Sequence, residues 1–322
     1  ADRETLKAQV SSLKPRLETL EQEVRTLGAD VERQLLLVPA PARADVPIGK
    51  DDSENVEIKR WGTVREFSFI PKTHMELGEK LDIIDIHRGV KLAGSRSYVL
   101  KGWGARLEQA ILRLTTDKLI NKNYTQLSIP VLVNEEAMTG TGYFPAGRDQ
   151  AYLIERDNMA LVGTAEVSLT SFHADEIIKD DQLPLRYFAQ SSCFRREAGT
   201  YGKDAHGLYR VHQFLKVEQV IIAKADVEGS EVLHNELLNN AEEILQDADG
   251  REDGSCPAVP DLAAGRQIGD LLDGLGIVHL SQAAGVGYCL AAGIAVRLIE
   301  QGRGDRLSRR EAGHIGDGRV GG

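Results

Sequence analysis

Two short charged clusters joined by a glycine-rich segment constrain the fold of this chain more than any other feature. The first cluster is Phe194 to Glu197, and the second is Arg210 to Glu218. An apolar and aromatic run, Leu185 to Cys193, precedes the first cluster, and a β-rich run, Phe214 to Ala223, begins inside the second. Two strands joined by one loop form a hairpin. The sequence therefore predicts a hairpin with a long loop.

The side chains at the inner ends of this hairpin suit a nucleotide together with an amino acid. They are Arg195, Glu197, Arg210, Phe214 and Glu218. A guanidinium can bind a phosphate through two parallel hydrogen bonds, and a phenylalanine ring can stack on a base. A carboxylate can accept hydrogen bonds from the amino group of adenine or from an ammonium. We therefore expect a binding site at this end of the hairpin.

The two clusters closely resemble motif 2 of the class II aminoacyl-tRNA synthetases, in the form found in the seryl-tRNA synthetase family. Other blocks resemble that family in the same order, over about Val46 to Gln246. They are Val46 to Val56 with Arg60-Trp61-Gly62, Gly94 to Arg96 with Leu100 to Glu108, Leu127 to Val133 as motif 1, and Gly163 to Val167 as the serine-binding segment. The resemblance implies an α+β fold, with an antiparallel sheet flanked by helices and preceded by a long coiled-coil helix.

The resemblance also implies a role for each matching residue, with Arg195 as the catalytic residue that bridges the α-phosphate and the attacking carboxylate. The implied ATP-binding residues are Arg195, Arg196, Glu197, Val211 and Phe214. The implied serine-binding residues are Thr164, Ala165, Glu166, Arg195 and Glu218. Contacts to the tRNA acceptor end would come from Tyr201, Lys203, His206 and Arg210. The implied substrates are L-serine, ATP with Mg²⁺, and tRNA(Ser), and the implied assembly is a homodimer through motif 1.

Each of these residues also has a purely structural interpretation. Arg195 could form a surface ion pair with Glu197, and Phe214 could be a core aromatic residue. Thr164 could cap a helix start before Glu166, and a solvated loop would have a composition like that of 198–209. Because side chains alternate along a strand, Arg196 is expected to point away from Arg195 and toward solvent.

The first segment, residues 1–40, carries a heptad pattern. Its apolar residues recur at steps of four and three: Leu6, Val10, Leu13, Leu17, Leu20, Val24, Leu27 and Val31. Such a narrow apolar seam needs a partner helix. Pro15 is expected to kink or weaken the helix locally. Within the resembled family this segment corresponds to part of the tRNA-binding arm, and a generic dimerising coiled coil is the alternative.

The segments that follow are expected to mix short strands with helices and to form the catalytic domain, residues 41–246. We expect helices at His74 to Leu81, Ala105 to Ile120 and Gly229 to Leu245, and a strand at Gln126 to Val133. Strands and helices do not alternate regularly, which favours an antiparallel α+β domain over a Rossmann sheet.

The last segment, residues 247–322, differs in composition from the rest. It holds half of the 32 glycines, has several arginines, and contains no lysine, phenylalanine or tryptophan. We expect a divergent, partly disordered tail with helices at Leu262 to Leu275 and Ala283 to Gln301. A shifted reading frame or spliced ending is one hypothesis for this composition.

This ending departs from the resembled family. Motif 3 and the acidic Mg²⁺ ligand are not recognisable after Gln246, and Gly293 to Arg297 only faintly echoes motif 3. A central strand would then be missing and a sheet edge exposed. Serine–tRNA ligation remains the leading hypothesis. The alternatives are an impaired fragment or paralogue that binds tRNA or a partner subunit, and a ligase that acts on a carrier protein.

Composition limits the classes of protein to which this chain can belong. Hydrophobic residues make up 42% of the chain, as in ordinary globular proteins, and the formal net charge is −10. That charge argues against an overall basic surface but leaves room for a local basic groove. The cysteines are scattered and indicate neither a disulfide framework nor a zinc site. No apolar run suits a membrane span, and we expect a cytoplasmic protein.

Overall fold

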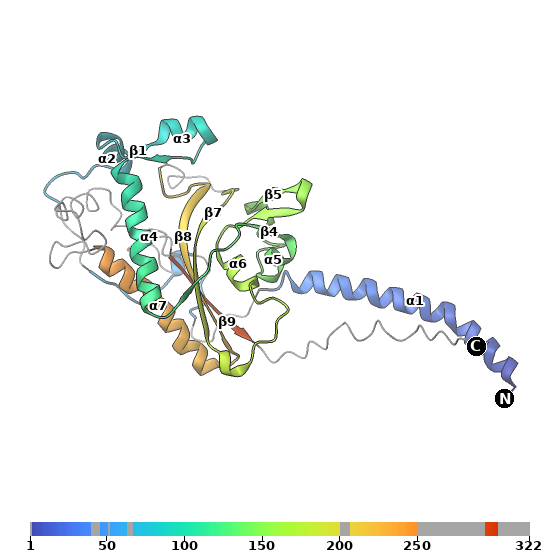
Figure 1. Ribbon diagram of the computed structural model, residues 1–322. Helices are drawn as coiled ribbons and strands as arrows, with labels where there is room; N and C mark the ends of the chain where they lie inside the picture. Colours follow the sequence, from blue (N-terminus) through green and yellow to red (C-terminus); the bar gives the residue numbers. More distant parts are fainter. Residues whose placement is uncertain are drawn as a thin grey trace.

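The computed structural model describes residues 2–39, 46–50, 52–62, 67–199, 207–249 and 294–301. Figure 1 shows a body of sheets and helices from which one long helix extends. The helices are α1 (Arg3–Leu35), α2 (His74–Lys80), α3 (Ile86–Ala93), α4 (Trp103–Asn121), α5 (Glu135–Gly140), α6 (Glu166–Ser171) and α7 (Val227–Asp249). The strands are β1 (Ile84–Asp85), β2 (Val99–Leu100), β3 (Thr125–Gln126), β4 (Leu132–Asn134), β5 (Tyr152–Ile154), β6 (Met159–Leu161), β7 (Leu185–Phe194), β8 (Gln213–Lys224) and β9 (Ile294–Gln301). Short 3-10 turns lie at η1 (Asp52–Glu54), η2 (Arg148–Gln150), η3 (Glu155–Asp157) and η4 (Asp180–Gln182).

The main sheet is built on the predicted hairpin. Its strand order is β3-β7-β8-β9, and β7 pairs antiparallel with β8 over its whole length, from Leu185 opposite Ile222 to Phe194 opposite Gln213. The outer strands β3 and β9 each run parallel to their neighbour. Two smaller sheets, β1-β2 and β4-β6-β5, are antiparallel throughout. The expected α+β class is confirmed, and the hairpin expected at Leu185 to Ala223 is confirmed with it.

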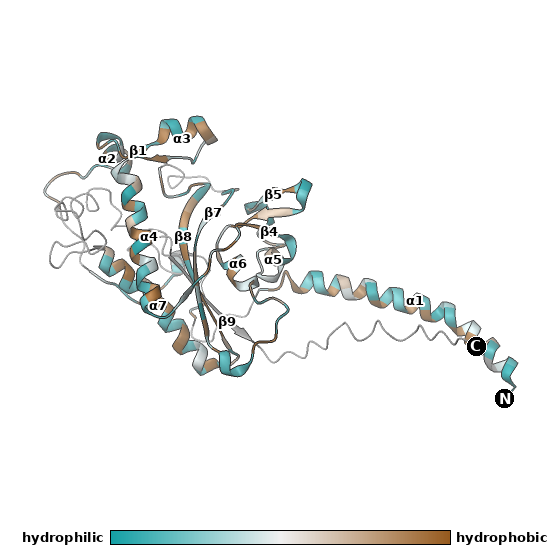
Figure 2. Cartoon of the chain, viewed as in Figure 1, coloured by the Kyte–Doolittle hydropathy of each residue, from teal (hydrophilic) through white to brown (hydrophobic). Residues whose placement is uncertain are grey.

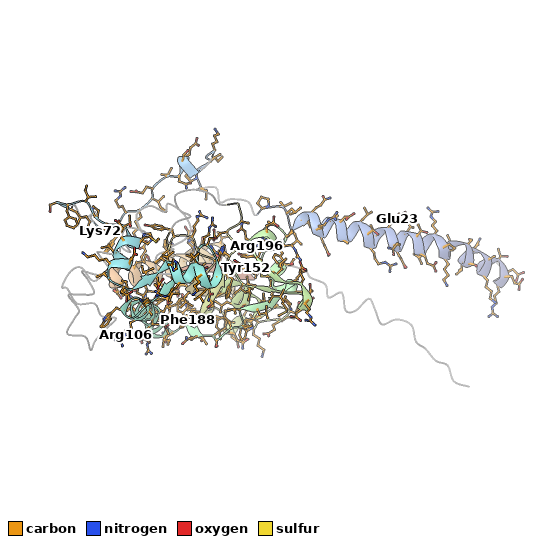
Figure 3. The ribbon with its side chains drawn as sticks, turned by 90° about the horizontal axis from the view of Figure 1, so that it is seen from above. Glu23, Lys72, Arg106, Tyr152, Phe188 and Arg196 are labelled. Atoms are coloured by element: carbon orange, nitrogen blue, oxygen red, sulfur yellow. The ribbon has the colours of Figure 1, made fainter. Side chains whose placement is uncertain are left out.

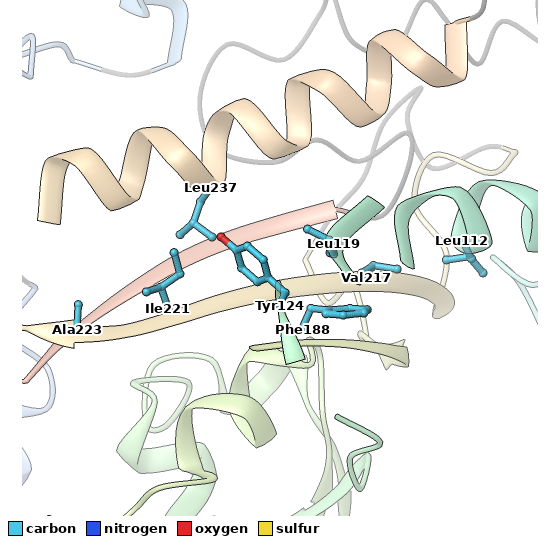
Figure 4. Packing of buried hydrophobic residues seen from close by; sticks show 8 residues of the cluster. All are labelled: Leu112, Leu119, Tyr124, Phe188, Val217, Ile221, Ala223 and Leu237. Carbon is cyan, nitrogen blue, oxygen red and sulfur yellow. The ribbon is translucent and has the colours of Figure 1, made fainter. Parts of the chain in front are cut away.

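One face of the main sheet is covered by α4 and α7. Between them lies a hydrophobic cluster that includes Phe188 and Val217 from the hairpin, Leu119 from α4 and Leu237 from α7. Figure 4 shows these side chains between the strands and α7. All four are fully buried, and burying a side chain of this size stabilises a fold by about 1.5–3 kcal/mol. This cluster packs the hairpin against α4 and α7 and so makes it a rigid support for its opposite face.

The other face of the hairpin packs against α6 and the segment before it. Ala189 and Val220 from the hairpin pack with Ala165 and Leu169, which belong to α6 and its start. The sheet β4-β6-β5 has a core of its own around Met138, Phe144 and Val162. The segment 162–165 therefore links the small sheet to α6 along this face of the hairpin, where charged side chains also lie.

The helices begin where the sequence supplies caps. The Thr73 hydroxyl accepts from the Glu76 amide, and the Glu76 carboxylate accepts from the Thr73 amide, which together form a capping box at α2. Asp85 caps α3 by accepting from the Arg88 amide at 2.8 Å. The helices predicted for α2, α4 and α7 are confirmed, with observed ends a few residues outside the predicted ones for α4 and α7.

The single strand expected over Gln126 to Val133 is wrong, because two strands of different sheets, β3 and β4, share this stretch. The Leu127 amide still donates to the Phe188 carbonyl, at 2.8 Å. Pro130 has no amide to continue the ladder, and its carbonyl accepts from the Ser168 hydroxyl at 2.7 Å. The chain thus leaves one sheet and enters the next around Pro130.

Helix α1 extends away from the body in two perpendicular views (Figures 1 and 3), and Glu23 lies well apart from Arg196 and Tyr152. Brown apolar positions recur along it in Figure 2. The seam residues from Val10 to Val31 are 47–69% exposed in the single chain. The helix runs unbroken through Pro15. Within the described part of the chain, no helix is both long enough and apolar enough to span a membrane.

Strand β9 corrects two expectations about the tail. It pairs in parallel with β8, from Ile294 opposite Val217 to Gln301 opposite Lys224, so the expectation of an exposed edge on β8 is wrong. The helix expected over Ala283 to Gln301 is also wrong for its last eight residues. Their short apolar run suits a strand as well as a helix, and pairing with β8 decides between the two. The helix expected at Leu262 to Leu275 lies outside the described residues.

Candidate active site

The candidate site lies on the face of the hairpin away from α4 and α7. Residues directly opposite each other in an antiparallel pair point to the same face, and Phe214 lies opposite Cys193 while Lys216 lies opposite Ser191. Residues Phe214, Lys216 and Glu218 therefore follow one another on one face of β8. Burial raises the pKa of the Cys193 thiol beside them on the neighbouring strand. The thiol thus stays protonated as part of the floor of the site.

The segment Gly163 to Ala165 crosses the end of β7 and forms a wall of the site. The Phe194 amide donates to the Val162 carbonyl at 2.9 Å. Gly163 packs so tightly on Tyr143 that an added Cβ would lie 2.1 Å from the tyrosine hydroxyl oxygen. A side chain at position 163 would have to displace the Tyr143 ring.

Arg195 lies at the inner end of β7 and is fixed by three contacts. Its amide donates to the His212 carbonyl at 2.9 Å, and its own carbonyl accepts from His212 Nδ1 at 3.0 Å. Its Nε donates to the Gly163 carbonyl at 3.2 Å. The guanidinium carbon lies 5.3 Å from the centre of the Phe214 ring, within the range of a cation–π contact. The structure thus brings together Arg195 and Phe214, two residues that the sequence assigned to ATP.

Glu197 occupies an unusual backbone position at the start of the loop. Its φ of 51° lies in the left-handed region, which few residues other than glycine adopt. Its carbonyl accepts from Arg96 Nη1 at 3.0 Å, and its carboxylate pairs with Arg210 at 3.2 Å. The structure thus gives Glu197 an ion-pair partner in Arg210, across the start and end of the loop.

Arg196 points away from Arg195 and is exposed, as strand alternation predicts. Its Nη1 donates to the Asp149 carbonyl at 3.1 Å and its amide donates to the Gln150 carbonyl at 2.9 Å. The Gln150 side chain also bonds to both the amide and the carbonyl of Ala198, at 3.1 and 2.9 Å. These contacts tie the start of the loop to η2.

Thr164, Lys216 and Glu218 form a compact buried group, called here the Thr164–Lys216–Glu218 cluster. Lys216 Nζ lies 2.6 Å from Glu218 Oε2 and donates to Thr164 Oγ1 at 2.5 Å. The Thr164 hydroxyl donates to the same Oε2 of Glu218. The side chains of Lys216 and Glu218 are only 6% and 1% exposed. A buried ion pair of this kind needs its hydrogen bonds satisfied, and the threonine hydroxyl contributes one of them.

The remaining described site residues lie next to this cluster. The Thr164 hydroxyl accepts from the Glu166 amide at 3.4 Å, and Ala165 occupies the N-cap position of α6. The helix cap suggested for Thr164 is thus displaced by one residue, to Ala165. Ala165 is fully buried in the core and Val211 is nearly so. Because both side chains are buried, the backbone groups of Ala165 and Val211 are the parts suited to contact a ligand.

Three of the expected tRNA contacts, Tyr201, Lys203 and His206, lie outside the described residues. No group of three or more His, Cys, Asp or Glu side chains in the described ranges could hold a metal ion.

Sequence reasoning missed Lys216, Gln150 and Arg96. Lys216 could have been found, because it stands two residues from both Phe214 and Glu218 on a predicted strand and so shares their face. Gln150 and Arg96 come from distant segments and have no local pattern that points to the hairpin.

Comparison with known proteins gives consistent matches. A family model described as the tRNA synthetase class II core domain (G, H, P, S and T) matches residues 152–253. The serine–tRNA ligase of Leptospira biflexa is 43% identical over 232 residues, which cover 72% of this chain and 55% of that protein. The serine–tRNA ligase of Thermodesulfovibrio yellowstonii is 41% identical over 249 residues, which cover 76% of this chain and 58% of that protein. The chain thus spans a little over half the length of these curated relatives.

Two solved structures have the same fold as this chain. Seryl-tRNA synthetase from Pyrococcus horikoshii, complexed with ATP, has a TM-score of 0.71 and 35% identity, and the match covers 75% of this chain and 58% of that one. The cytoplasmic serine–tRNA ligase from Naegleria fowleri, in complex with AMP, has a TM-score of 0.69 and 25% identity, with 75% and 57% covered.

Proposed function

The chain belongs to the seryl-tRNA synthetase family, and from that premise we propose that it uses ATP to activate L-serine as seryl-adenylate and transfers the seryl group to tRNA(Ser). The observation that carries the proposal is the shared face of β8. On it Phe214, Lys216 and Glu218 follow in order, and Arg195 lies against Phe214 from the neighbouring strand. A base site, a phosphate site and an ammonium site thus lie in one line.

Arg195 is the proposed catalytic residue. Adenylate formation requires in-line attack of the serine carboxylate on the α-phosphorus of ATP, and negative charge gathers there in the transition state. A guanidinium held by the Gly163 carbonyl at 3.2 Å cannot swing freely. It can therefore stabilise that charge and align the two reactants at once.

The adenine is proposed to stack on Phe214, with Glu197 accepting from its amino group and the Val211 backbone completing its recognition. Because the Glu197 carboxylate pairs with Arg210 at 3.2 Å, that carboxylate is oriented before any nucleotide binds. Arg196 is proposed to act through the backbone of η2, which it contacts, and so to hold Glu197 in its left-handed conformation.

The serine pocket is proposed to consist of Thr164, Ala165, Glu166 and Glu218, with Arg195 on the carboxylate. Glu218 is 1% exposed and would accept from the ammonium or the hydroxyl of serine. A site built on such a hydrogen bond discriminates strongly against alanine, because the buried acceptor would otherwise be left unpaired.

The rest of the proposal concerns substrates and partners beyond this face. Arg210, with Tyr201, Lys203 and His206, is proposed to meet the tRNA acceptor end. Residues 1–40 are proposed as part of a tRNA-binding arm, 41–246 as the catalytic domain and 247–322 as a divergent tail. A second copy is proposed to bind through motif 1, and the site of action is proposed to be the cytoplasm. Mg²⁺ would accompany ATP, but no step above depends on it.

The test is serine-dependent exchange of pyrophosphate into ATP by the purified chain. We expect exchange with L-serine and none with L-alanine. Removal of a preorganised donor to transition-state charge costs about 100-fold or more in rate, and we expect that loss in Arg195→Ala. Arg113→Ala is the matched control, since Arg113 is exposed on α4 and pairs with its helix neighbour Asp117. A folded chain without exchange would refute the proposal.

A further inference from the structure

Lys216 holds the carboxylate that the proposed function assigns to the substrate. Its Nζ lies 2.6 Å from Glu218 Oε2, and both side chains are almost completely buried. The Thr164 hydroxyl bonds to the same oxygen and also accepts from Lys216. In this structure Glu218 therefore already has a cation, placed by its own strand.

A substrate ammonium that reaches Glu218 meets this cation. Two cations close to one buried carboxylate repel each other strongly, because little water screens them. Serine can thus bind well only if an anion is supplied to Lys216 at the same time. Because the proposed function assigns the serine carboxylate to Arg195, the α-phosphate of ATP is the anion left for Lys216.

The geometry of β8 places Lys216 where this anion would be. Residues i and i+2 of a strand share a face, and Phe214 and Glu218 are four residues apart, roughly 13 Å along the strand. An adenylate with its base on Phe214 and its ammonium at Glu218 has its phosphoryl and carboxyl oxygens between them. Lys216 lies midway, and Arg195 lies beside Phe214 with its guanidinium carbon 5.3 Å from the ring.

We propose that Lys216 couples the binding of the two substrates. In the empty site it neutralises Glu218. When ATP binds, Lys216 turns to the anionic oxygens at the centre of the site and leaves Glu218 to the ammonium of serine. This inference rests on the proposed function and adds to it a positive coupling between the two substrate sites: bound ATP raises the affinity for serine, and bound serine raises the affinity for ATP by the same factor.

The experiment is calorimetric titration of L-serine into the full chain, alone and in the presence of saturating α,β-methylene ATP, which cannot be split at the bond that adenylation breaks. For the unaltered chain we expect the nucleotide to tighten serine binding by about tenfold. In Lys216→Met we expect serine alone to bind at least as tightly as in the unaltered chain. The nucleotide should then change its affinity by less than about twofold.

The matched control is Lys224→Met. Lys224 lies on the same strand but is 55% exposed and pairs with Asp180 at the surface, so its removal should leave the coupling intact. Lys216→Gln is a second neutral variant in case Lys216→Met does not fold, as judged by circular dichroism. Lys216→Arg keeps the charge and should retain part of the coupling, which a purely structural role in the core would not predict.

The two proposals fail in different ways. If the unaltered chain binds neither ligand, both the proposed function and the proposed role of Lys216 are refuted. If the unaltered chain binds serine and ATP but without coupling, or if Lys216→Met keeps the coupling of the unaltered chain, only the role of Lys216 is refuted.

Discussion

The ion pair between Arg186 and Glu236 joins β7 to α7, on the face of the hairpin that α4 and α7 cover. Removing this pair tests how much the packing of α7 stabilises the fold that supports the site. Arg186 Nε and Nη2 each donate to one oxygen of Glu236 at 2.8 Å. The Tyr124 hydroxyl adds a third bond at 2.7 Å. The two charged side chains are 28% and 31% exposed. A two-pronged, half-buried pair of this kind stabilises a fold more than a surface ion pair does.

The expected magnitude follows from these contacts. Arg186→Met removes both charged hydrogen bonds and leaves a half-buried carboxylate, at a cost of about 2 kcal/mol. In a domain of this size that lowers the melting temperature by roughly 4–8 °C. Arg113→Met is the control, because the Arg113–Asp117 pair on α4 is 75% and 46% exposed. Its loss should cost less than about 0.5 kcal/mol.

The destabilisation caused by Arg186→Met should become smaller as the pH falls. The hydrogen bond from Arg186, the largest cause, holds the pKa of Glu236 below its ordinary value of 4.5. A lowered pKa in the folded state means that this stabilisation is complete above the ordinary value and is lost as the pH falls through the lowered one. In urea unfolding, the free energy of unfolding of the native chain should therefore exceed that of Arg186→Met by a wide margin near pH 7 and by a smaller one at about pH 4. A gap that stays constant with pH, or a cost no larger than that of Arg113→Met, would refute this reasoning.

Two further predictions concern the site itself. Gly163→Ala should lower the exchange rate by about tenfold or more, because its Cβ would lie 2.1 Å from the Tyr143 hydroxyl oxygen and would displace the carbonyl that holds Arg195. Gly140→Ala has open space around the new atom and should leave the rate unchanged, so equal rates in both variants would contradict the prediction. Phe214→Leu should raise the KM for ATP by roughly threefold to tenfold while the KM for serine stays the same. A change in the KM for serine alone would contradict base stacking at Phe214.

The hairpin could be predicted because its signals are local. Both strands are long runs of apolar and β-branched residues on either side of one polar segment, so their pairing did not depend on any distant part of the chain. The helices α4 and α7 were equally predictable, since each carries an apolar face over several turns. The placement of Phe214 and Glu218 at the inner end of the hairpin needed no more than the order of the two clusters in the sequence.

Other features depended on tertiary contacts that leave no local pattern. The stretch around Pro130 looked like one strand because it is rich in Leu, Ile and Val, yet its two ends pair in two different sheets. Gln150 holds Ala198 through both its side-chain groups, and nothing in its neighbourhood indicates that partner. Strand β9 was expected as part of a helix, because a short apolar run fits either structure until a neighbouring strand is available.

The arrangement of substrates along β8 is tested most directly by a crystal structure of the chain with a sulfamoyl analogue of seryl-adenylate, which cannot be hydrolysed. We expect the adenine on the Phe214 ring, the sulfamoyl group within hydrogen-bond reach of Arg195, and the ammonium on Glu218 with Lys216 turned away from it. An analogue bound with its base away from Phe214, or one whose ammonium makes no contact with Glu218, would contradict the assignment of the site.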